Sequence, residues 1–414
     1  MSDYVPASRV TRIKSSASVA AAARVRELKA EGIPIMDLTV GEPDFDTPDH
    51  IKAAAIEAIN AGETKYTSVT GTPELQTAIL RKIENHTGHH YEPNQLTIGG
   101  GAKQVLYVAL MASLNEGDEV IVPAPYWVSY PDMVLANDGT PVIVACGEDT
   151  GFKLTPAALE RAITPKTKWL ILNAPSNPTG AVYSREELRA LGAVLEEHPH
   201  VFILTDEIYD EIHFGDGRVT SLVTAAPALK ERILLVNGVS KAYAMTGWRL
   251  GYGVGPAPLI AAMNKLQSQT SSCPSSISQA AATAALNGDQ SFVRDSVEVY
   301  RKRRDAAVEG LNAINGLSVA PAEGAFYAYV NCSGVIGKTA PDGKVIENDQ
   351  DFTLYLLDAA RVAVIQGSAY GLGPYFRISF ATSLETINAG VDSIRDAVNA
   401  LSQAPQKDPS YDPR

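Results

Sequence analysis

The sequence predicts an α/β fold, in which a large domain is built on a mostly parallel sheet and a smaller domain is of the α+β type. From about residue 95, short apolar runs alternate with helical segments, which is the pattern of successive strand–helix units. The apolar runs are continuous, as expected for strands that are buried on both faces. With 414 residues, 45% of them apolar, the chain is also long enough for two domains.

The segment before this alternation is predicted to be mainly helical. A first helix is expected over 17–31, where Gly32 ends it. Two further helices share one pattern, with a threonine as N-cap, a proline in the first turn and a glycine at the end. These residues are Thr47, Pro48 and Gly62 in one helix, and Thr72, Pro73 and Gly88 in the next.

The strands of the large domain follow at regular intervals. They are predicted within the segments 95–101, 118–125, 140–146, 167–173, 200–206, 232–238 and 249–255. The chain then continues with a helical segment at about 275–316, strands within 324–332 and 361–382, and helices at 351–361 and 383–402. We therefore expect a large domain at 48–290, a small domain formed by 1–47 together with 291–402, a surface loop at 333–350 and a flexible tail at 403–414.

Composition and charge exclude several classes of protein. The formal net charge of −12 argues against a nucleic-acid partner, which requires a basic face. No stretch reaches the roughly 20 apolar residues of a membrane span, and the N-terminus has no apolar region of signal-peptide form. Cys146, Cys273 and Cys332 are scattered and odd in number, so we expect a reducing compartment, the cytoplasm.

Polar residues gather where the predicted strands end, and in such sheets ligands bind beyond the carboxyl ends of the strands. Lys241 and Arg249 lie in the stretch NGVSKAYAMTGWRLGYG, which is rich in glycine and serine. Arg377 lies inside an apolar strand, where an arginine is rarely buried without an anionic partner. The other candidates are the strand-end acid Asp206, Tyr209, the amide Asn177, Trp127 and the glycine loop IGGGAKQ at 98–104.

Each of these features also has an ordinary structural explanation. The glycine loop could be a simple turn, since it matches neither the Walker A nor the G-x-G-x-x-G pattern. Asp206 could be a helix N-cap, Asn177 part of a proline turn and Trp127 a core residue.

Two clusters of basic side chains are interpreted as surface features. The histidines of HTGHH (86–90) are predicted to be exposed turn residues, so no metal site is expected. The basic cluster at 301–304 is predicted to be a solvated helix face.

The strand-end features together indicate a single ligand. A phosphate cradle, an acid, an amide, a Trp, a lysine in a permissive loop and a nearby arginine suit a molecule with three parts. These are a phosphate, a flat aromatic ring with a basic nitrogen, and an aldehyde that captures the lysine. The sequence therefore predicts pyridoxal 5′-phosphate (PLP) as the cofactor.

The chain also resembles a known family from about residue 5 to 402. The motifs VGEPDFDTP, KYTSVTGTPELQ, GGGAKQ, PYWVSYPD, NAPSNPTGAVY, TDEIYDEI, SKAYAMTGWRLGY and FRISFATS are similar in order and spacing to those of fold-type I PLP enzymes. The resemblance is to class I aminotransferases of the bacterial aspartate subgroup, some members of which act on prephenate. It implies a large PLP-binding domain with a mostly parallel seven-stranded sheet.

The resemblance also implies roles for residues around the cofactor. Lys241 matches the lysine that bonds to the cofactor aldehyde and then moves the proton, and a nearby cation would lower its pKa into a useful range. Gly238 stands where some relatives have a phosphate-binding serine, and Ser240 is the candidate replacement. The remaining cofactor-binding matches are Gly101, Ala102, Lys103 and Arg249 for the phosphate, Asp206 for the ring nitrogen, Tyr209 and Asn177 for the ring oxygen, Trp127 for the ring face, and Tyr66 for the phosphate of a neighbouring subunit.

On the substrate side, Arg377 matches the clamp for the α-carboxylate, and Gly41 matches a backbone contact that closes over the substrate. Lys103 and Ser18 match residues that hold a distal carboxylate, while Trp127 and Asn177 border the substrate as well as the cofactor. The implied partners are amino acids and 2-oxo acids, and the shared sites imply a homodimer.

The expected reaction converts L-aspartate and 2-oxoglutarate into oxaloacetate and L-glutamate by a ping-pong route through pyridoxamine phosphate. A prephenate or aromatic aminotransferase is the nearest alternative, and one enzyme could do both. A regulator that keeps this fold as a sensor is an alternative of another class. Because the fold is expected to begin within about ten residues, the sequence leaves no room for the DNA-binding domain of such a regulator.

Overall fold

The computed structural model describes residues 4–15 and 17–402, with the side chains of 17 and 18 left out, and the expected tail at 403–414 lies outside this range. A seven-stranded sheet lies at its centre, in the order β2-β8-β7-β6-β5-β3-β4. Strand β8 is antiparallel to both of its neighbours, and all other pairs are parallel, which confirms the predicted sheet. Its strands are β2 (Leu96–Gly99), β3 (Glu119–Ala124), β4 (Thr140–Ala145), β5 (Thr167–Asn173), β6 (Phe202–Asp206), β7 (Ile233–Gly238) and β8 (Gly251–Val254).

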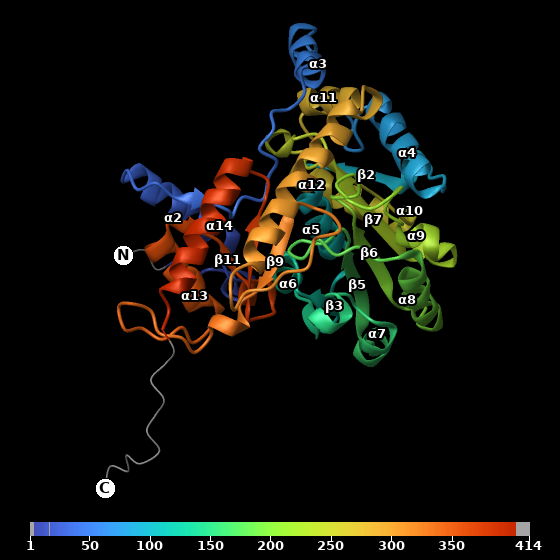
Figure 1. Cartoon of the computed structure of the whole chain (residues 1–414). Helices are drawn as coiled ribbons and strands as arrows, with labels where there is room; N and C mark the ends of the chain where they lie inside the picture. The colour runs from blue at the N-terminus through green and yellow to red at the C-terminus, as the bar shows by residue number, and fades with distance from the viewer. Residues whose placement is uncertain (1–3, 16, 403–414) are drawn as a thin grey trace.

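Helices cover both faces of this sheet because successive strand residues are apolar and point to opposite sides (Figure 1). In β3, Val120 and Val122 pack toward α5, α6 and α10, whereas Ile121 packs into the cluster that includes α4, α8 and α11. The helices are α3 (Asp49–Asn60), α4 (Pro73–Thr87), α5 (Ala102–Ser113), α6 (Ser129–Ala136), α7 (Pro156–Ala162), α8 (Arg185–Glu197), α9 (Leu222–Ala225), α10 (Ala257–Thr270) and α11 (Ser276–Asn287).

A second apolar core lies around a three-stranded antiparallel sheet in the order β11-β12-β9. The N-terminal segment joins this part of the molecule, since β1 pairs with β10 in parallel. The domain boundaries stay a prediction, and this pairing agrees with them. The elements are α2 (Ala17–Ala30), β1 (Met36–Asp37), α12 (Ser291–Asn312), β9 (Tyr327–Asn331), α13 (Asp349–Tyr355), a π-helical turn (Leu356–Ala360), β10 (Val362–Ala363), β11 (Ile365–Gln366), β12 (Tyr375–Ser379) and α14 (Leu384–Asn399).

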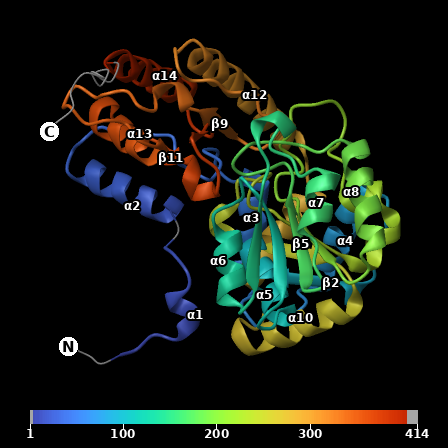
Figure 2. The ribbon, with the colours of Figure 1, turned by 90° about the horizontal axis from the view of Figure 1, so that it is seen from below.

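The chain begins with an arm that runs along the large sheet domain before it reaches the second core (Figure 2). Its short helix α1 (Ser8–Thr11) lies beside α6. There Arg12 pairs with Asp138, and the backbone N–H of Lys14 donates to Asp132. In the part of the chain that the structure describes, no helix has both the length and the apolar character needed to cross a membrane.

Two local predictions about helix ends have different outcomes. Thr72 caps α4 by accepting from the N–H of Leu75, and Gly88 ends it with a positive φ of 75°, as predicted. Thr47 does not cap α3, because its hydroxyl donates to the carbonyl of Ala244 at 2.6 Å and the helix begins after Pro48.

Three further predictions were wrong, the first because of a local turn and the other two because long-range contacts bury the side chains. The helical segment predicted at 275–316 is two helices, and Asp289 accepts from the N–H of Ser291 at the break. Of the histidines at 86–90, the side chain of His86 is only 7% exposed and contacts Glu207, whereas that of His90 is 64% exposed as predicted. The cluster at 301–304 is not a solvated face, since Arg303 is buried against Asp44 and Arg304 lies over the ring of Phe214.

Candidate active site

A cavity of about 530 Å³ lies where the carboxyl ends of the large-sheet strands face β12 and the residues after β1. It brings together most of the residues predicted from the sequence, although they are spread over more than 300 positions. Those that line it are Gly41, Ala102, Lys103, Trp127, Asn177, Asp206, Tyr209, Ser240, Lys241, Arg249 and Arg377.

Asp206 ends β6 and is only 4% exposed. Tyr130 of α6 donates to its Oδ2 at 2.6 Å, and the N–H of Ile208 donates to its Oδ1 at 3.3 Å. Burial nevertheless raises the pKa of Asp206 to about 6, because these bonds only partly replace water. A carboxylate kept this dry favours a cationic N–H group as its partner in the cavity.

Lys241 follows β7 and reaches into the same space. Its Nζ donates to the carbonyl of Gly41 at 2.5 Å. Burial lowers the pKa of Lys241 to about 8. Arg377 and Arg249 also lower it, whereas Glu42 and Asp206 act in the opposite direction. A lysine with such a pKa is partly neutral near pH 8, so it can act as a nucleophile and as a base.

Arg377 of β12 is 2% exposed and approaches the cavity from the opposite side. Its Nη1 donates to Oδ1 of Asn177 at 2.9 Å, and its Nη2 donates to the carbonyl of Thr39 at 2.7 Å. The Nε has no hydrogen-bond partner, and among the described residues no carboxylate forms an ion pair with this guanidinium. A buried cation held only by neutral acceptors leaves an attractive position for a carboxylate.

The N-terminus of α5 forms a second candidate anion-binding site. Gly101 precedes the helix with a φ of 95° and no side chain caps the helix, so its first N–H groups have no side-chain partner at this end. Arg249 itself donates only to backbone carbonyls, those of Thr246 at 2.8 Å and Gly100 at 3.3 Å. Lys103 lies 4.6 Å from the centre of the Trp127 ring, and burial followed by repulsion from Arg249 lowers its pKa.

The floor of the cavity is held by hydrogen bonds between side chains at strand ends. The hydroxyls of Tyr209 and Tyr327 lie 2.8 Å apart. Asn173 accepts from the N–H of Asn177 at 2.8 Å and donates to the carbonyl of Asp206 at 2.9 Å. Burial raises the pKa of Tyr209 well above its usual range, so this phenol stays protonated and can donate.

Two predicted residues, Gly101 and Tyr66, do not line the cavity. Gly101 lies directly behind its wall, at the start of α5. Tyr66 is 90% exposed and lies away from the cavity, and the side chain of Ser18 lies outside the described residues.

Several residues that surround this cavity were not predicted from the sequence, chiefly Tyr130, Tyr327, Asn173 and Glu42. Tyr130 lies in the PYWVSYPD motif, and its position on α6 after the strand-end tryptophan was the one available signal. The contacts of Tyr327 and Asn173 depend on the tertiary fold. Within the described part of the chain, no group of three or more His, Cys, Asp or Glu side chains is arranged to hold a metal ion.

Comparisons with known proteins agree with this arrangement. Residues 33–394 match the family model described as aminotransferase class I and II. The chain is 52% identical over 399 residues to an aspartate aminotransferase of Rhizobium meliloti (strain 1021), covering 96% of this chain and 97% of the relative. It is 53% identical over 393 residues to an aspartate/prephenate aminotransferase of Cereibacter sphaeroides, covering 95% and 98% of the two chains.

Solved structures show the same fold. The crystal structure of the Rhizobium meliloti aspartate aminotransferase superposes with a TM-score of 0.94, at 52% identity, and covers 96% of this chain and 100% of the other. That of a Thermus thermophilus aspartate aminotransferase with maleate gives a TM-score of 0.88 at 39% identity and covers 95% and 100%. The chain belongs to the class I and II aminotransferase family.

Proposed function

We propose that the chain is a PLP-dependent aspartate aminotransferase, which moves the amino group of L-aspartate to 2-oxoglutarate. The observation that carries this proposal is that Lys241, Asp206 and Arg377 meet in one cavity, together with an anion cradle at α5. The names of the relatives from Rhizobium meliloti and Cereibacter sphaeroides support the same substrate class.

The residues of the cavity suit PLP in charge and in shape. A Cβ added to Gly101 would displace the guanidinium of Arg249, so glycine suits a cradle in which the backbone and Arg249 together hold a phosphate. The phosphate would be held by the backbone of Gly101, Ala102 and Lys103 and by Arg249. Asp206 would hold the ring nitrogen, Trp127 would lie on the ring face, and Tyr209 with Asn177 would donate to the ring oxygen.

When bound, PLP supplies an aldehyde for amine capture and an electron-poor ring that stabilises negative charge on the substrate Cα. Lys241 would attack through neutral Nζ and then carry a proton to and from the substrate Cα, for which its pKa of about 8 is well placed. Asp206 would keep the ring nitrogen protonated. The loop that contains Gly41 would close over the substrate and exclude water during these steps.

The substrate would be oriented by its two carboxylates. Arg377 would bind the α-carboxylate with its planar fork, and its Nε has no other partner. Lys103 is a second cation in the same cavity, and with Ser18 it would bind the distal carboxylate of a dicarboxylic substrate.

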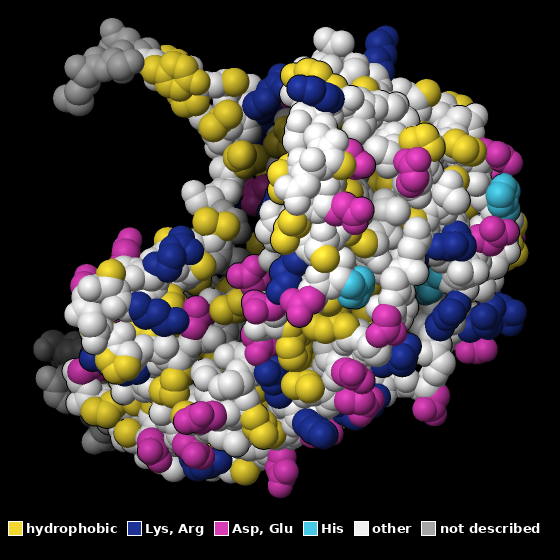
Figure 3. All heavy atoms as spheres, turned by 90° about the horizontal axis from the view of Figure 1, so that it is seen from above, with side chains coloured by type: hydrophobic (Ala, Val, Ile, Leu, Met, Phe, Trp, Pro, Cys, Tyr) yellow, Lys and Arg dark blue, Asp and Glu magenta, His cyan; other side chains and the backbone are white. Residues whose placement is uncertain are grey.

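A homodimer belongs to the same proposal. Tyr66 and the helix side chains Ile56 and Ile59 are 90%, 58% and 50% exposed in the single chain, and further apolar side chains extend along the N-terminal arm (Figure 3). Large exposed apolar side chains of this kind are typical of an interface between subunits. Tyr66 would then reach the phosphate in the site of the second subunit.

Light scattering should give about twice the 44.1 kDa chain mass, and a monomer with full activity would contradict shared sites. The cytoplasmic location is proposed from the cysteine pattern alone.

Competing assays test the substrate. We expect turnover of L-aspartate with 2-oxoglutarate, and the name of the Cereibacter sphaeroides relative favours prephenate as the second acceptor to test. If purified protein loaded with PLP aminates prephenate with L-glutamate as the donor but does not turn over L-aspartate with 2-oxoglutarate, the aspartate assignment is wrong.

A further inference from the structure

The turn that follows β6 has two faces with different chemistry. Asp206, Ile208 and Tyr209 line the active-site cavity. Glu207 and Asp210, which are 5% exposed, lie on the other side. The residues proposed to hold the cofactor are therefore carried by the same turn as two buried carboxylates that the reaction does not use.

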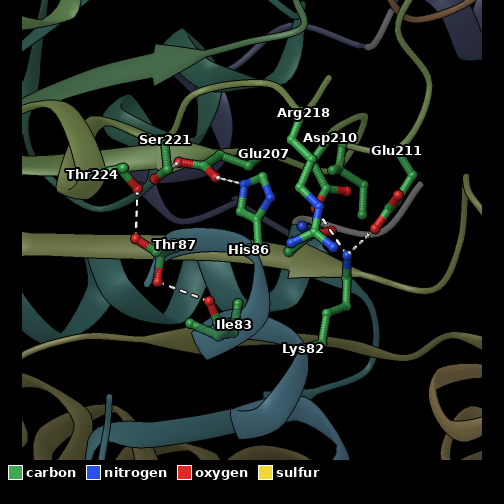
Figure 4. A network of polar contacts seen from close by, with 12 residues as sticks. Lys82, Ile83, His86, Thr87, Glu207, Asp210, Glu211, Arg218, Ser221 and Thr224 are labelled. Carbon is green, nitrogen blue, oxygen red and sulfur yellow. Dashed lines mark hydrogen bonds and ion pairs between the residues drawn. The ribbon is translucent and has the colours of Figure 1, made fainter. Parts of the chain in front are cut away.

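Side chains of helix α4 contact these carboxylates (Figure 4). Lys82 donates to Asp210 at 2.9 Å and to Glu211 at 2.7 Å, and its side chain is 11% exposed. Nε2 of His86 lies 3.3 Å from Oε2 of Glu207. Because Lys82 and His86 are four residues apart, they lie on one face of the helix. We call these two residues the α4 clamp.

The chain after the turn is tied to the end of the same helix. Ser221 donates to Oε1 of Glu207 at 2.7 Å. Arg218 donates to the carbonyl of Asn85, and Thr224 donates to that of Thr87 at 2.9 Å. These donors satisfy carbonyls that a helix C-terminus leaves without partners. The two ends of the segment 207–224 are thus fixed to α4 (Figure 4), whereas its middle pairs with residues 323–325.

The α4 clamp faces three carboxylates, those of Glu207, Asp210 and Glu211. Burial alone would lower the pKa of Lys82, but Asp210 and Glu211 raise it well above its usual range, so it stays charged. Burial would raise the pKa of Asp210, and Lys82 with His86 holds it below its usual range. Replacing such a buried pair by apolar residues is often neutral for stability, whereas removing one partner leaves a buried charge unpaired.

We infer that the α4 clamp positions the turn from Asp206 to Tyr209. Lys82 and His86 thereby determine the cofactor affinity and the electrostatic potential of the cofactor site, although neither residue lines the cavity. Lys82 and His86 are positioning residues, and the inference rests on the function proposed above. When Lys82 is lost, the unpaired Asp210 and Glu211 draw water and shift the turn. The added negative charge also favours the protonated form of the group that Lys241 makes with the cofactor.

The test compares Lys82→Met with Lys82→Arg and wild type, all loaded with PLP. For Lys82→Met we expect the cofactor to dissociate about tenfold faster or more. The pH midpoint of the cofactor absorbance change should move upward by about half a unit. Lys82→Arg keeps charge and donors and should stay within about threefold of wild type. Lys82→Gln keeps a donor without the charge, and its dissociation rate should lie between those of the other two variants.

Lys153→Met is the matched control, since Lys153 pairs with Glu187 at 2.6 Å in the same domain and does not line the cavity. It should lose thermal stability and keep both the dissociation rate and the pH midpoint. The inference is wrong if Lys82→Gln, and Lys82→Met where it folds, match wild type in both quantities and lose only stability. If wild type itself binds no PLP, the proposed function fails and the inference falls with it.

Discussion

The burial of Arg377 is the feature of the site that the needs of the fold explain least. The side chain is buried, it donates only to an amide oxygen and a carbonyl, and its Nε has no hydrogen-bond partner. The sequence analysis singled it out because an arginine inside an apolar strand is rarely buried without an anion. The structure therefore agrees with the reason for which this residue was selected.

Arg377→Ala should lower kcat/KM for aspartate by about 10²- to 10³-fold, because a buried charge-assisted contact contributes about 2–5 kcal/mol. Most of the loss should come from a higher KM. The affinity for PLP, measured by absorbance titration, should change by no more than about threefold. Equal losses of substrate and cofactor binding would contradict a role at the substrate carboxylate.

Asp206 leads to a prediction about pH. Its pKa is about 6, so the carboxylate is available above pH 6 and is lost as the pH falls through that value. The hydrogen bond from Tyr130 keeps this pKa lower than burial alone would set it.

Tyr130→Phe should therefore raise the pKa of Asp206 and move the acid limb of PLP affinity to higher pH. The measurement is the dissociation constant of PLP between about pH 5 and 8 for both proteins. Because Lys241 titrates in both, the difference between the two curves isolates Asp206. Superimposable curves would show that Tyr130 does not tune this acid.

At the scale of elements, the start of α5 depends on one glycine. Gly101 has a φ of 95°, and a Cβ there would meet Arg249. We expect Gly101→Ala to lower PLP affinity at least about tenfold, with a backbone cost of about 1–3 kcal/mol.

Gly117→Ala is its control, since Gly117 has a φ of 93° and nothing within 4 Å of the added Cβ. Both variants should lose similar unfolding free energy, measured by chemical denaturation. Only Gly101→Ala should lose cofactor affinity. If the two lose affinity equally, the cradle at α5 is not the phosphate site.

Elements with strong local signals could be predicted from the sequence. Continuous apolar runs followed by glycine or proline loops mark the strands of the large sheet, and Thr72 with Gly88 marks the ends of α4. The site residues at strand ends were predictable because parallel strands bring their carboxyl ends to one edge.

Contacts between distant elements could not be predicted in the same way. The hydroxyl of Thr47 bonds to Ala244, which lies 197 positions away. His86 is covered by Glu207 and Arg303 by Asp44, so side chains that look exposed by local pattern are buried. The partner of Asp206, Tyr130, is also distant in sequence, and only the fold brings the two together.

At the scale of the whole molecule, α12 connects the two apolar cores. Its first turn contributes Val293 to the core of the large sheet, and the rest of the helix contributes residues such as Tyr300 to the second core. Arg303 on this helix donates both Nη groups to Asp44, at 2.7 and 2.8 Å, and lies over the ring of Phe45. This pair therefore fastens the loop after Gly41 to the helix that spans both cores.

Arg303→Met should cost about 1–2 kcal/mol of unfolding free energy, because it breaks the pair between the buried Arg303 and Asp44, whose side chain is 29% exposed. It should also raise the KM for aspartate, since the loop after Gly41 loses its anchor. Arg395→Met, which breaks an exposed pair with Asp392, should cost less than about 1 kcal/mol and leave KM unchanged. If the two variants behave alike, Arg303 does not anchor the loop.

The absorbance spectrum of the protein with and without Lys241 tests the central claim most directly. Wild-type protein mixed with PLP and then dialysed should keep a band between roughly 360 and 430 nm that moves with pH, and aspartate should change it. Lys241→Ala should lose the pH-dependent band and all turnover while remaining folded by circular dichroism. A wild-type protein that stays colourless after PLP is added, or a Lys241→Ala variant that keeps turnover, would contradict the account.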